Sequence, residues 1–292
     1  MPTQPIDFHR TPSDAPVLVT AASGKTGRRI ADGLTAHGVS VRRGSRRGQT
    51  PFDWDAPRTW AAALEGAWAA TISFVPDLAV PSAAPAIAAF VDAAAHAGVQ
   101  RLVLLSGRGE PGAQACERIV LDGPIDATVV RASWFNQNFS EGPFADMIRA
   151  GVIALPGGDV PEPFIDADDI AEVMIAALLE DRHIGTVHEV TGPELLTLSE
   201  VAALFTRAGH PVAYTPISVQ DFERTLLDRG APAPYAAMLC DLITMGSDGR
   251  NARLANGIED ALGRPARSIH QFIDRHVAGG TWSRSAMEVP HG

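Results

Sequence analysis

The sequence predicts an α/β protein: a Rossmann-type, doubly wound parallel sheet joined to a smaller mixed α/β region. Two observations support this prediction. In the first half of the chain, short apolar runs alternate with amphipathic helical segments, as in parallel strands joined by right-handed crossover helices. In the second half, short strands mix with helices that carry their own capping residues, which indicates a separate, smaller region.

The first strand is expected at residues 16–20 (PVLVT), a short apolar run typical of a buried parallel strand. It leads through a turn into a helix over 26–37, which Gly38 can end. The other strands of the first half share this apolar character and are expected at 39–42, 70–75, 102–105 and 127–130. The helices between them are expected around Ile87, Phe90, Val91 and Ala94, closed by Gly98, and over 112–121.

The pattern changes after Arg131. A further strand is expected at 186–190. Three helices are expected to begin at a Ser or Thr that caps the first turn, paired with an acidic or amide residue three positions later: Thr197 with Glu200, Ser218 with Asp221, and Ser268 with Gln271. We therefore expect a Rossmann domain over 14–150, the smaller region over 151–277 interleaved with it, and flexible tails over 1–13 and 278–292.

The composition excludes several classes of function. The chain has 292 residues and a net charge of −10, which repels nucleic-acid phosphates, so no nucleic-acid partner is expected. No apolar run approaches the ~20 residues that span a membrane. The N-terminal residues lack the apolar segment of a signal peptide, so we expect a cytoplasmic protein without a membrane partner. Cys116 and Cys240 are isolated and predict no metal site or disulfide; both are expected to be small buried hydrophobes.

A glycine-containing turn, VTAASGKTG at 19–27, lies between the first strand and the first helix. The N-terminus of a helix presents free backbone N–H groups and a partial positive charge, which suits a pyrophosphate. Gly24 and Gly27 have the Gly-x-x-Gly spacing that allows backbone and phosphate to approach closely, and Lys25 is the single lysine among 24 basic residues. The alternative interpretation is an ordinary turn between a strand and a helix.

Four arginines lie within six residues at the end of the second predicted strand, RRGSRR at 42–47. NAD-binding proteins place an acidic residue there to bind the ribose hydroxyls, whereas arginine suits the 2′-phosphate of NADP. The segment therefore predicts NADP(H) as the cofactor. The alternative interpretation is a solvated basic loop.

The chain resembles the NmrA-like atypical short-chain dehydrogenases, and within them the ergot-alkaloid type of reductase, which includes the festuclavine- and agroclavine-forming enzymes. The resemblance extends over about residues 16 to 210, with weaker similarity toward the C-terminus at PYAAML and LGRPARSIHQF. The matching segments are VTAASGKTGRRIA, GSRRG, FDWDAPRTW, RLVLLSG, VVRASWFNQNFSEG, PFIDADDIAEV and TGPELLTLSEVA.

The resemblance implies a role for each matching segment. The residues implied to contact the pyrophosphate and the adenosine phosphate are Ala21, Ser23, Gly24, Lys25, Thr26, Gly27, Ser45 and Arg46. Those implied near the adenine, the cofactor ribose and the nicotinamide are Asp53, Trp54, Phe74, Val75, Pro76, Ser106, Gly107 and Arg108. Those implied to border the substrate are Ser133, Trp134, Phe135, Asn138 and Phe139. The smaller region is therefore expected on the substrate side.

Two residues depart from the family pattern at expected cofactor contacts. Ala21 stands where the family usually has the first glycine of the turn, and Ala132 stands where a proline usually follows Arg131. An added methyl group in a tight turn costs ~1 kcal/mol or more if the backbone adopts a positive φ. We therefore expect Ala21 to weaken cofactor binding more than Ala132 does.

The sequence offers no evident acid or base. The Tyr-x-x-x-Lys pair of common short-chain dehydrogenases is impossible, because the two tyrosines, Tyr214 and Tyr235, lie far downstream of Lys25. Ser106 and Trp134 are pocket candidates, and the catalytic residues stay open. The other polar and aromatic candidates are expected to be structural: Trp54, Trp60, Trp68, Asp166, Asp168, Asp169, His183 and His188.

Taken together, these features predict an NADPH-dependent reductase of a small, cyclic, natural-product-like substrate. Hydride transfer to an imine, an iminium ion or a conjugated acceptor needs less help from an acid than ketone reduction does. Two alternatives are a non-catalytic NADP(H)-binding regulator or redox sensor, and a non-redox enzyme on the same fold. The oligomeric state, monomer or homodimer, is left open by the sequence.

Overall fold

The computed structural model describes residues 15–283. The chain divides into two compact units. Unit 1 contains the described residues up to Ala132, together with Ala167–Thr191 and Ala255–Pro265. Unit 2 contains Ser133–Asp166, Gly192–Leu254 and the described residues from Ala266 onward. The expected N-terminal tail, 1–13, and residues 284–292 of the expected C-terminal tail lie outside the described residues.

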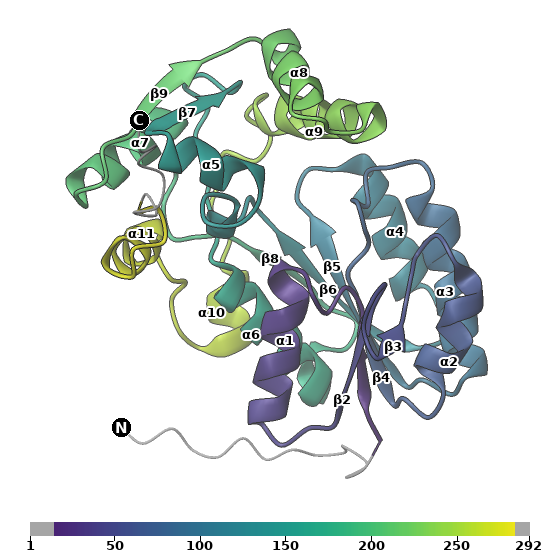
Figure 1. Cartoon of the computed structure of the whole chain (residues 1–292). Coiled ribbons are helices and arrows are strands. Elements are labelled where there is room, and N and C mark those ends of the chain that lie inside the picture. Colours follow the sequence, from purple (N-terminus) through teal and green to yellow (C-terminus); the bar gives the residue numbers. More distant parts are fainter. Residues whose placement is uncertain (1–14, 284–292) are drawn as a thin grey trace, which may run out of the picture. The chain divides into compact units, whose positions relative to one another are not determined.

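Unit 1 is built on a seven-stranded sheet in which every paired neighbour is parallel, in the order β3-β2-β1-β4-β5-β6-β8 (Figure 1). The strands are β1 (Val17–Val19), β2 (Val41–Ser45), β3 (Thr50–Pro51), β4 (Ala69–Ile72), β5 (Arg101–Gly107), β6 (Asp126–Ala132) and β8 (Val187–Val190). The predicted doubly wound parallel sheet is confirmed. Because parallel strands end at one edge, the segments after β1, β2, β4 and β5 are neighbours there.

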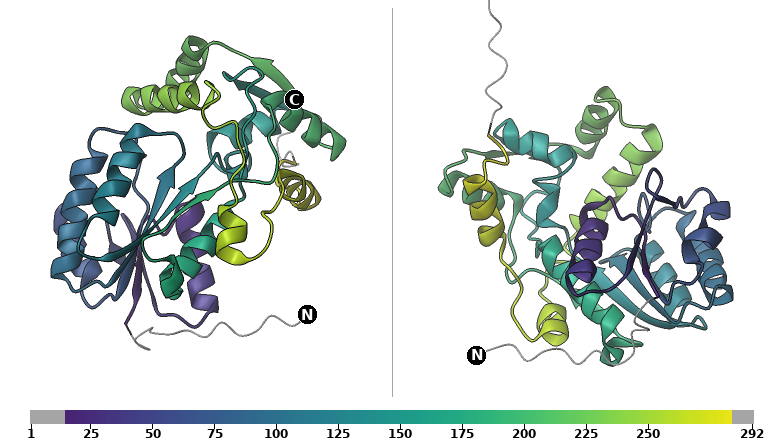
Figure 2. Two further views of the ribbon diagram at one scale, coloured as in Figure 1. Left: turned by 180° about the vertical axis from the view of Figure 1, so that it is seen from behind. Right: turned by 60° about the horizontal axis from the view of Figure 1, so that its bottom comes forward.

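Helices cover both faces of this sheet, with α1, α6 and α10 on one face and α2, α3 and α4 on the other (Figure 2). Their bounds are α1 (Lys25–Ala36), α2 (Trp60–Leu64), α3 (Ala83–His96), α4 (Pro111–Leu121), α6 (Ala167–Leu179) and α10 (Gly257–Leu262), with 3₁₀ turns η1 (Pro57–Thr59) and η3 (Asp181–His183). The expected apolar stripe of α3 is buried at Ile87, Phe90, Val91 and Ala94.

An aromatic cluster fills the space between the sheet and α3. Phe52, Trp54, Trp60 and Phe90 are all buried, and the ring centroids of Trp54 and Phe90 lie 5.1 Å apart. Trp54 donates its indole N–H to the carbonyl of Ser73 at 3.0 Å. Edge-to-face pairs of this kind add to the free energy of burial. The expectation that these tryptophans are packing residues is confirmed.

Unit 2 contains a two-stranded parallel sheet of β7 (Val152–Leu155) and β9 (Ala213–Pro216). Its helices are α5 (Pro143–Arg149), α7 (Leu198–Arg207), α8 (Val219–Asp228), α9 (Ala233–Gly246) and α11 (Ile269–Ala278), with the 3₁₀ turn η2 (Asn136–Asn138). The three predicted N-caps are confirmed at α7, α8 and α11, where Thr197, Ser218 and Ser268 each accept a backbone N–H three residues on.

The division of the chain differs from the expected boundary at residue 150. Unit 1 is interrupted after Ala132, because the chain leaves the sheet at the end of β6 and returns to add α6 and β8. β8 pairs with β6 along Val129–Ala132, so the sheet is incomplete without residues from the second half of the sequence. The sequence predicts that the two regions interleave. The boundaries between them depend on the pairing of β8 with β6, which the periodicity of the sequence does not reveal.

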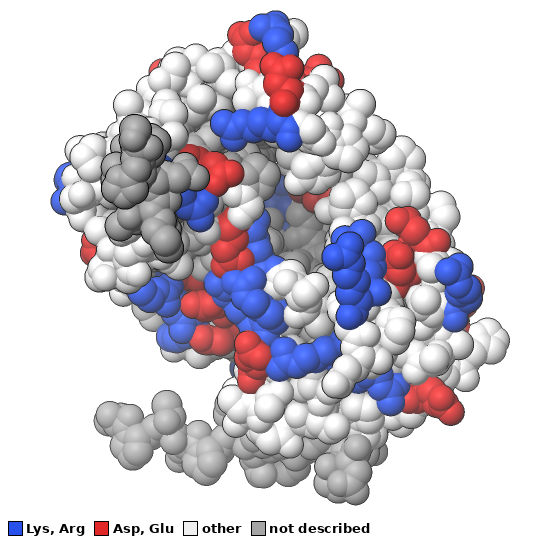
Figure 3. All heavy atoms as spheres, in the orientation of Figure 1, with Lys and Arg blue, Asp and Glu red and all other residues white. Residues whose placement is uncertain are grey.

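On the face drawn in Figure 3, acidic side chains (red) lie among basic ones (blue). Within residues 15–283, every helix is too short or too polar to cross a lipid bilayer.

The prediction of a flexible C-terminal tail over 278–292 is wrong for the first of these residues. Trp282 is 1% exposed and belongs to the core of unit 2. Its indole N–H donates to the carbonyl of Phe139 at 2.8 Å, and its ring lies 5.0 Å from that of Phe205, centroid to centroid. A tryptophan at this position supplies enough apolar surface to hold the chain end in place.

We predict that Trp282→Ala destabilises the protein by about 3–5 kcal/mol, since it removes a buried indole and leaves a cavity. Leu227→Ala is the control, because Leu227 is 42% exposed on α8 and its loss should change the free energy of unfolding by less than about 0.5 kcal/mol. Urea unfolding followed by circular dichroism measures both. Equal, small effects of the two substitutions would show that residues 278–283 are a tail after all.

Candidate functional site

The turn between β1 and α1 is folded tightly on itself. The N–H of Gly24 donates to the carbonyl of Ala21 at 2.8 Å. A Cβ atom at Gly27 would lie only 2.2 Å from the carbonyl oxygen of Ala21. Glycine is therefore required at position 27 so that the first turn of α1 can pack against the backbone of the turn. This close contact fixes where the N-terminus of α1 points.

The N-terminus of α1 is left available for an anion. Gly24 occupies the N-cap, which has no side-chain hydrogen bond, and the first turn contains no acidic residue. Free backbone N–H groups and the helix dipole favour a negative group at such an end. The predicted segment from Ser23 to Gly27 thus has the backbone arrangement that a phosphate group requires.

Ala21 adopts a backbone φ of +48°, the single non-glycine residue with positive φ in the part of the chain that the structure describes. This conformation costs an alanine about 1–2 kcal/mol, whereas glycine adopts it freely. Ala21, which replaces the glycine usual in the family, therefore has a strained backbone. The turn keeps the shape that glycine would give it.

The four arginines of 42–47 divide into two kinds. Arg42 donates to the carbonyls of Ala63 and Glu65 at 2.7 and 2.6 Å, and so joins β2 to the end of α2. Arg43 forms an ion pair with Asp32 of α1 at 2.7 Å. Arg42 is therefore structural, whereas Arg43 forms an ion pair at the surface.

Arg46 and Arg47 are exposed in the turn that follows β2, and neither forms an ion pair with any described residue. Beside this turn an open groove follows β2, and Ser23, Arg43, Ser45 and Gly48 contribute to its lining. Arginine in the turn after the second strand is placed to bind a phosphate of an adenine nucleotide. Of the four arginines, these two form no ion pair with a described residue, and Arg43 lines the groove beside them.

The residues expected near the adenine and ribose have different surroundings. Trp54 is buried in the aromatic cluster, and the backbone carbonyl of Asp53 accepts the indole N–H of Trp60 at 2.9 Å. The Trp54 ring is therefore committed to the core. After β4, Phe74 is half-buried, whereas Val75 is 45% exposed. Val75 is thus available to contact a ligand.

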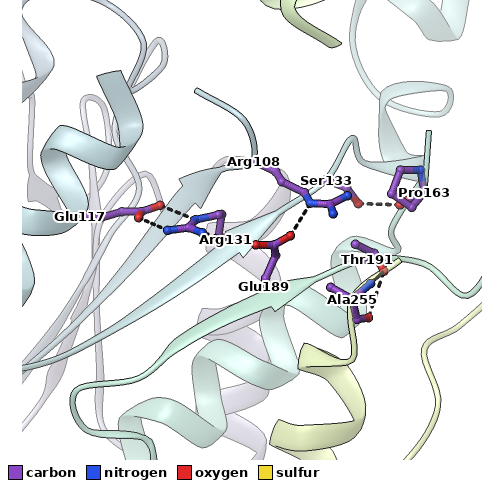
Figure 4. A network of polar contacts seen from close by, with 8 residues as sticks. All are labelled: Arg108, Glu117, Arg131, Ser133, Pro163, Glu189, Thr191 and Ala255. Atoms are coloured by element: carbon purple, nitrogen blue, oxygen red, sulfur yellow. Dashed lines mark hydrogen bonds and ion pairs between the residues drawn. The ribbon is translucent and has the colours of Figure 1, made fainter. Parts of the chain in front are cut away.

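A charged network lies at the carboxyl ends of β5, β6 and β8 (Figure 4). Arg131 of β6 makes two hydrogen bonds to the carboxylate of Glu117 on α4, one of them 2.9 Å long from Nε to Oε1. It also lies 3.3 Å from Glu189 of β8. Arg108, just after β5, donates from Nε to Glu189 at 2.7 Å. Ser106 of β5 completes the network by donating to Glu117 at 2.6 Å.

The sequence did not predict that Ser106 and Arg108 would bond to glutamates in this network. Both side chains are buried and bonded to glutamates, so they hold the sheet edge together. Charge-assisted hydrogen bonds of this kind are short and strong, and breaking one leaves a buried charge. At the end of β5 the backbone of Gly107 and the side chain of Glu110 follow this network.

A second pair of carboxyl groups lies beside this backbone. A Cβ atom at Gly107 would lie 2.1 Å from Oε1 of Glu110, so the Glu110 side chain packs directly on Gly107. Burial, and then the charge and hydrogen bond of Asp77, raise the pKa of Glu110 to about 8. Burial likewise raises the pKa of Asp77. Glu110 is therefore protonated at neutral pH and can donate a proton.

Sequence reasoning missed Glu110. Glu110 precedes Pro111 at the N-terminus of α4. An acidic side chain there is ordinarily explained by its favourable interaction with the helix dipole. Its unusual environment depends on Asp77, which lies 33 positions earlier in the chain at the end of another strand. The signal that existed was the position of both carboxyls just after two neighbouring strands, β4 and β5.

The remaining titratable candidates are structural, as expected. His183 and His188 share a hydrogen bond of 2.9 Å, and burial lowers the pKa of His183 to about 4 and lowers that of His188. Asp168 pairs with Arg29 at 2.6 Å, and Asp169 pairs with Arg264 at 2.7 Å. Asp166 of unit 2 accepts hydrogen bonds from Gln137 and Arg275, at 2.6 and 2.9 Å. Cys116 and Cys240 are buried thiols.

Unit 2 contains an apolar pocket of its own. Trp134 and Phe139 line it, together with Phe144 and Phe164. The rings of Trp134 and Phe144 are stacked, with 6.2 Å between centroids and 9° between planes. Of the expected substrate residues, Ser133, Phe135 and Asn138 are not among those that line this pocket. The Ser133 hydroxyl donates to the carbonyl of Pro163 at 2.6 Å (Figure 4).

Known proteins resemble this chain over almost its whole length. The uncharacterized oxidoreductase YesF of Bacillus subtilis is 32% identical over 276 residues, 90% of this chain and 96% of YesF. Agroclavine dehydrogenase of Claviceps fusiformis is also 32% identical, over 277 residues, 88% of this chain and 96% of the dehydrogenase. These two similarities agree with the resemblance noted from the sequence motifs.

Solved structures support the fold. An NADPH-dependent quinone oxidoreductase of Escherichia coli, solved with NADPH, has a TM-score of 0.71 and 22% identity, over 89% of this chain and 99% of that one. The family model described as the NmrA-like family matches residues 115–269, which is more than half of the sequence. This chain therefore belongs to the NmrA-like family.

Proposed function

We propose that this protein is an NADPH-dependent reductase of a small cyclic substrate that carries an imine, an iminium ion or a conjugated acceptor. The observation that carries the proposal is the carboxyl edge of the unit 1 sheet: an uncapped helix N-terminus, two unpaired arginines after β2, and a protonated carboxyl group beside Gly107. Relatives named as oxidoreductases and dehydrogenases, similar over almost the whole chain, support it.

The residues present fit NADPH. The backbone of Ser23–Gly27 at the start of α1 would hold the pyrophosphate, and Arg46, with Ser45, would hold the 2′-phosphate. Val75, exposed after β4, would contact the cofactor ribose, and the backbone of Gly107 would lie near the nicotinamide. When bound, NADPH supplies a hydride from the nicotinamide ring. The strain at Ala21 is compatible with binding, since the turn keeps its tight form.

The proposed substrate class follows from whether the product of hydride addition needs a proton. Hydride addition to an iminium ion gives a neutral amine and needs no proton in that step. Addition to a conjugated acceptor gives a delocalised anion, which a nearby acid stabilises by protonation. Glu110 supplies such an acid, so the proposal covers both kinds of acceptor. A simple ketone gives a localised alkoxide, for which common short-chain dehydrogenases use the Tyr-x-x-x-Lys pair that this sequence lacks.

The apolar pocket of unit 2 favours an enzyme over a regulator that only binds NADP(H). A recessed pocket lined by Trp134 and Phe139 suits a small organic molecule, whereas a protein partner is usually met by an exposed apolar patch. Substrate positioning and exclusion of water are the contributions expected of these aromatic side chains.

We predict that the protein binds NADPH more tightly than NADH, and that Arg46→Ala weakens NADPH binding roughly ten- to a hundredfold without changing NADH binding. A charge-assisted contact to the 2′-phosphate accounts for the difference, at ~1.5–3 kcal/mol. Isothermal titration calorimetry with both nucleotides measures it, with the exposed Arg224→Ala on α8 as control. Equal affinities of the wild-type protein for the two nucleotides would contradict the cofactor assignment.

We predict that reduction of a quinone depends on protonated Glu110 and declines as the pH rises through about 8, the pH at which this raised pKa lets Glu110 lose its proton. Asp77 and Glu117 are the charged groups that act on Glu110 and keep its pKa high. Glu110→Gln should lower quinone turnover about a hundredfold. It should leave turnover of an N-alkyl cyclic iminium ion within about threefold of wild type, because that step needs no proton.

The control for this prediction is Asp122→Asn, which removes an exposed carboxyl group at the other end of α4. Steady-state turnover between pH 6 and 10, expressed as the ratio of variant to wild type, separates the role of Glu110 from the intrinsic pH dependence of the quinone. Parallel losses with quinone and iminium substrates would indicate that Glu110 is structural.

A further inference from the structure

Two carboxyl groups lie together at the carboxyl edge of the unit 1 sheet, that of Asp77 after β4 and that of Glu110 after β5. Backbone contacts hold the two segments against each other. A Cβ atom at Gly112, in the first turn of α4, would lie 3.0 Å from the carbonyl oxygen of Leu78 and 3.1 Å from Cα of Ala79. The loop that contains Asp77 is therefore packed on the helix that begins after Glu110.

The two carboxyl groups differ in the hydrogen bonds that they accept. Oδ1 of Asp77 accepts the N–H of Ala79 at 2.8 Å, which favours the ionised form of this group. Oε2 of Glu110 is buried and accepts no hydrogen bond from the described residues, and a buried charge without a donor is costly. Glu110 therefore holds the proton in its hydrogen bond with Asp77, and the pair shares one proton and one negative charge.

The surroundings of the pair keep this proton in place. The titratable and charged groups around Glu110 come from the segments after β4 and β5, from β6 and from α4: Asp77, Arg108, Cys116, Glu117 and Arg131. Burial, then the charge and hydrogen bond of Asp77, and then the charge of Glu117 raise the pKa of Glu110 to about 8. Because negative neighbours hold the proton on Glu110, an added positive charge beside it would favour release of the proton.

The nicotinamide ring of the proposed cofactor is such a charge in one of its two states. Glu110 packs on Gly107, the backbone that the proposed function assigns to the nicotinamide. The ring is neutral in NADPH and positively charged in NADP⁺. Coulomb attraction to the positive ring stabilises the Glu110 carboxylate, whereas the neutral ring does not. The two forms have the same phosphates, so the effects of the phosphates cancel when the forms are compared.

We propose that Asp77 and Glu110 form a proton-sharing pair that releases its proton when the nicotinamide bound beside Gly107 is oxidised. This inference rests on the proposed function, because it gives the pair a role in that reaction. When a conjugated acceptor is reduced, the hydride adds to the acceptor carbon and Glu110 gives its proton to the resulting anion. The Glu110 carboxylate then remains beside the positive ring. Asp77 is a positioning residue, which keeps the proton on Glu110 until hydride transfer.

The test counts the protons released when each form of the cofactor binds. Isothermal titration calorimetry of the full chain at pH 7.5, in Hepes and in Tris, gives this number from the difference between the two observed enthalpies. We expect NADP⁺ to release about half a proton more than NADPH, because only NADP⁺ brings a positive ring to Glu110. Equal proton release by the two nucleotides would overturn the proposal.

Two variants separate the roles of the pair. In Glu110→Gln, which has no proton to lose, we expect NADP⁺ and NADPH to release equal numbers of protons. In Asp77→Asn, which removes the neighbouring charge, the pH at which the two nucleotides differ most should fall by about one unit. A purely structural role of Asp77 would not produce this shift. Asp122→Asn, at the exposed other end of α4, is the control and should behave as wild type. A difference that persists in Glu110→Gln, or an unshifted pH in Asp77→Asn, would overturn the assignment.

The wild-type protein alone keeps the test decisive if a variant does not fold. The difference between the nucleotides should shrink toward zero at pH 5.5, where Glu110 keeps its proton with either nucleotide, and again at pH 9.5, where it has lost the proton with both. A difference that is constant over this range would contradict the proposal. Binding of neither nucleotide would contradict the proposed function and this inference together, whereas binding of both with equal proton release contradicts this inference alone.

Discussion

Two arginines hold the carboxyl edge of the unit 1 sheet together, and each is paired with a glutamate that lies mostly out of solvent. Arg131 bonds Glu117, Arg108 bonds Glu189, and a contact between Arg131 and Glu189 joins the two pairs across β5, β6 and β8. Beside these pairs, burial and then the charge and hydrogen bond of Asp77 raise the pKa of Glu110 to about 8, which keeps a proton at the sheet edge at neutral pH.

The arginines at and after β2 also divide into residues bonded within the fold and residues that remain available to a ligand. Arg42 and Arg43 are bonded within the fold, and Arg46 and Arg47 remain for a ligand. The tight approach of Gly27 to Ala21 fixes the N-terminus of α1 beside them. The strained φ of Ala21 shows that this turn is retained even with a residue that disfavours it. A geometry kept at an energetic cost of about 1–2 kcal/mol is consistent with a functional turn.

Much of the fold could be predicted from local patterns, and much of the chemistry could not. The strands of unit 1 are short apolar runs, and the caps at Thr197, Ser218 and Ser268 are local sequence signals, so periodicity and capping rules found them. The unit boundary at Ala132 and the burial of Trp282 depend on contacts between distant segments. Glu110 escaped notice for the same reason: its environment comes from Asp77, which only the folded chain brings near.

Isotope transfer tests most directly whether the protein transfers a hydride from NADPH to a small cyclic acceptor, with an iminium ion as the probe. The two diastereomers of NADPH carrying deuterium at nicotinamide C4 are incubated separately with 2-methyl-3,4-dihydroisoquinolinium and the protein. Mass spectrometry of the 2-methyl-tetrahydroisoquinoline then locates the label. We expect deuterium at the former iminium carbon from one diastereomer and none from the other. Unlabelled product from both, or no enzyme-dependent product, would contradict it.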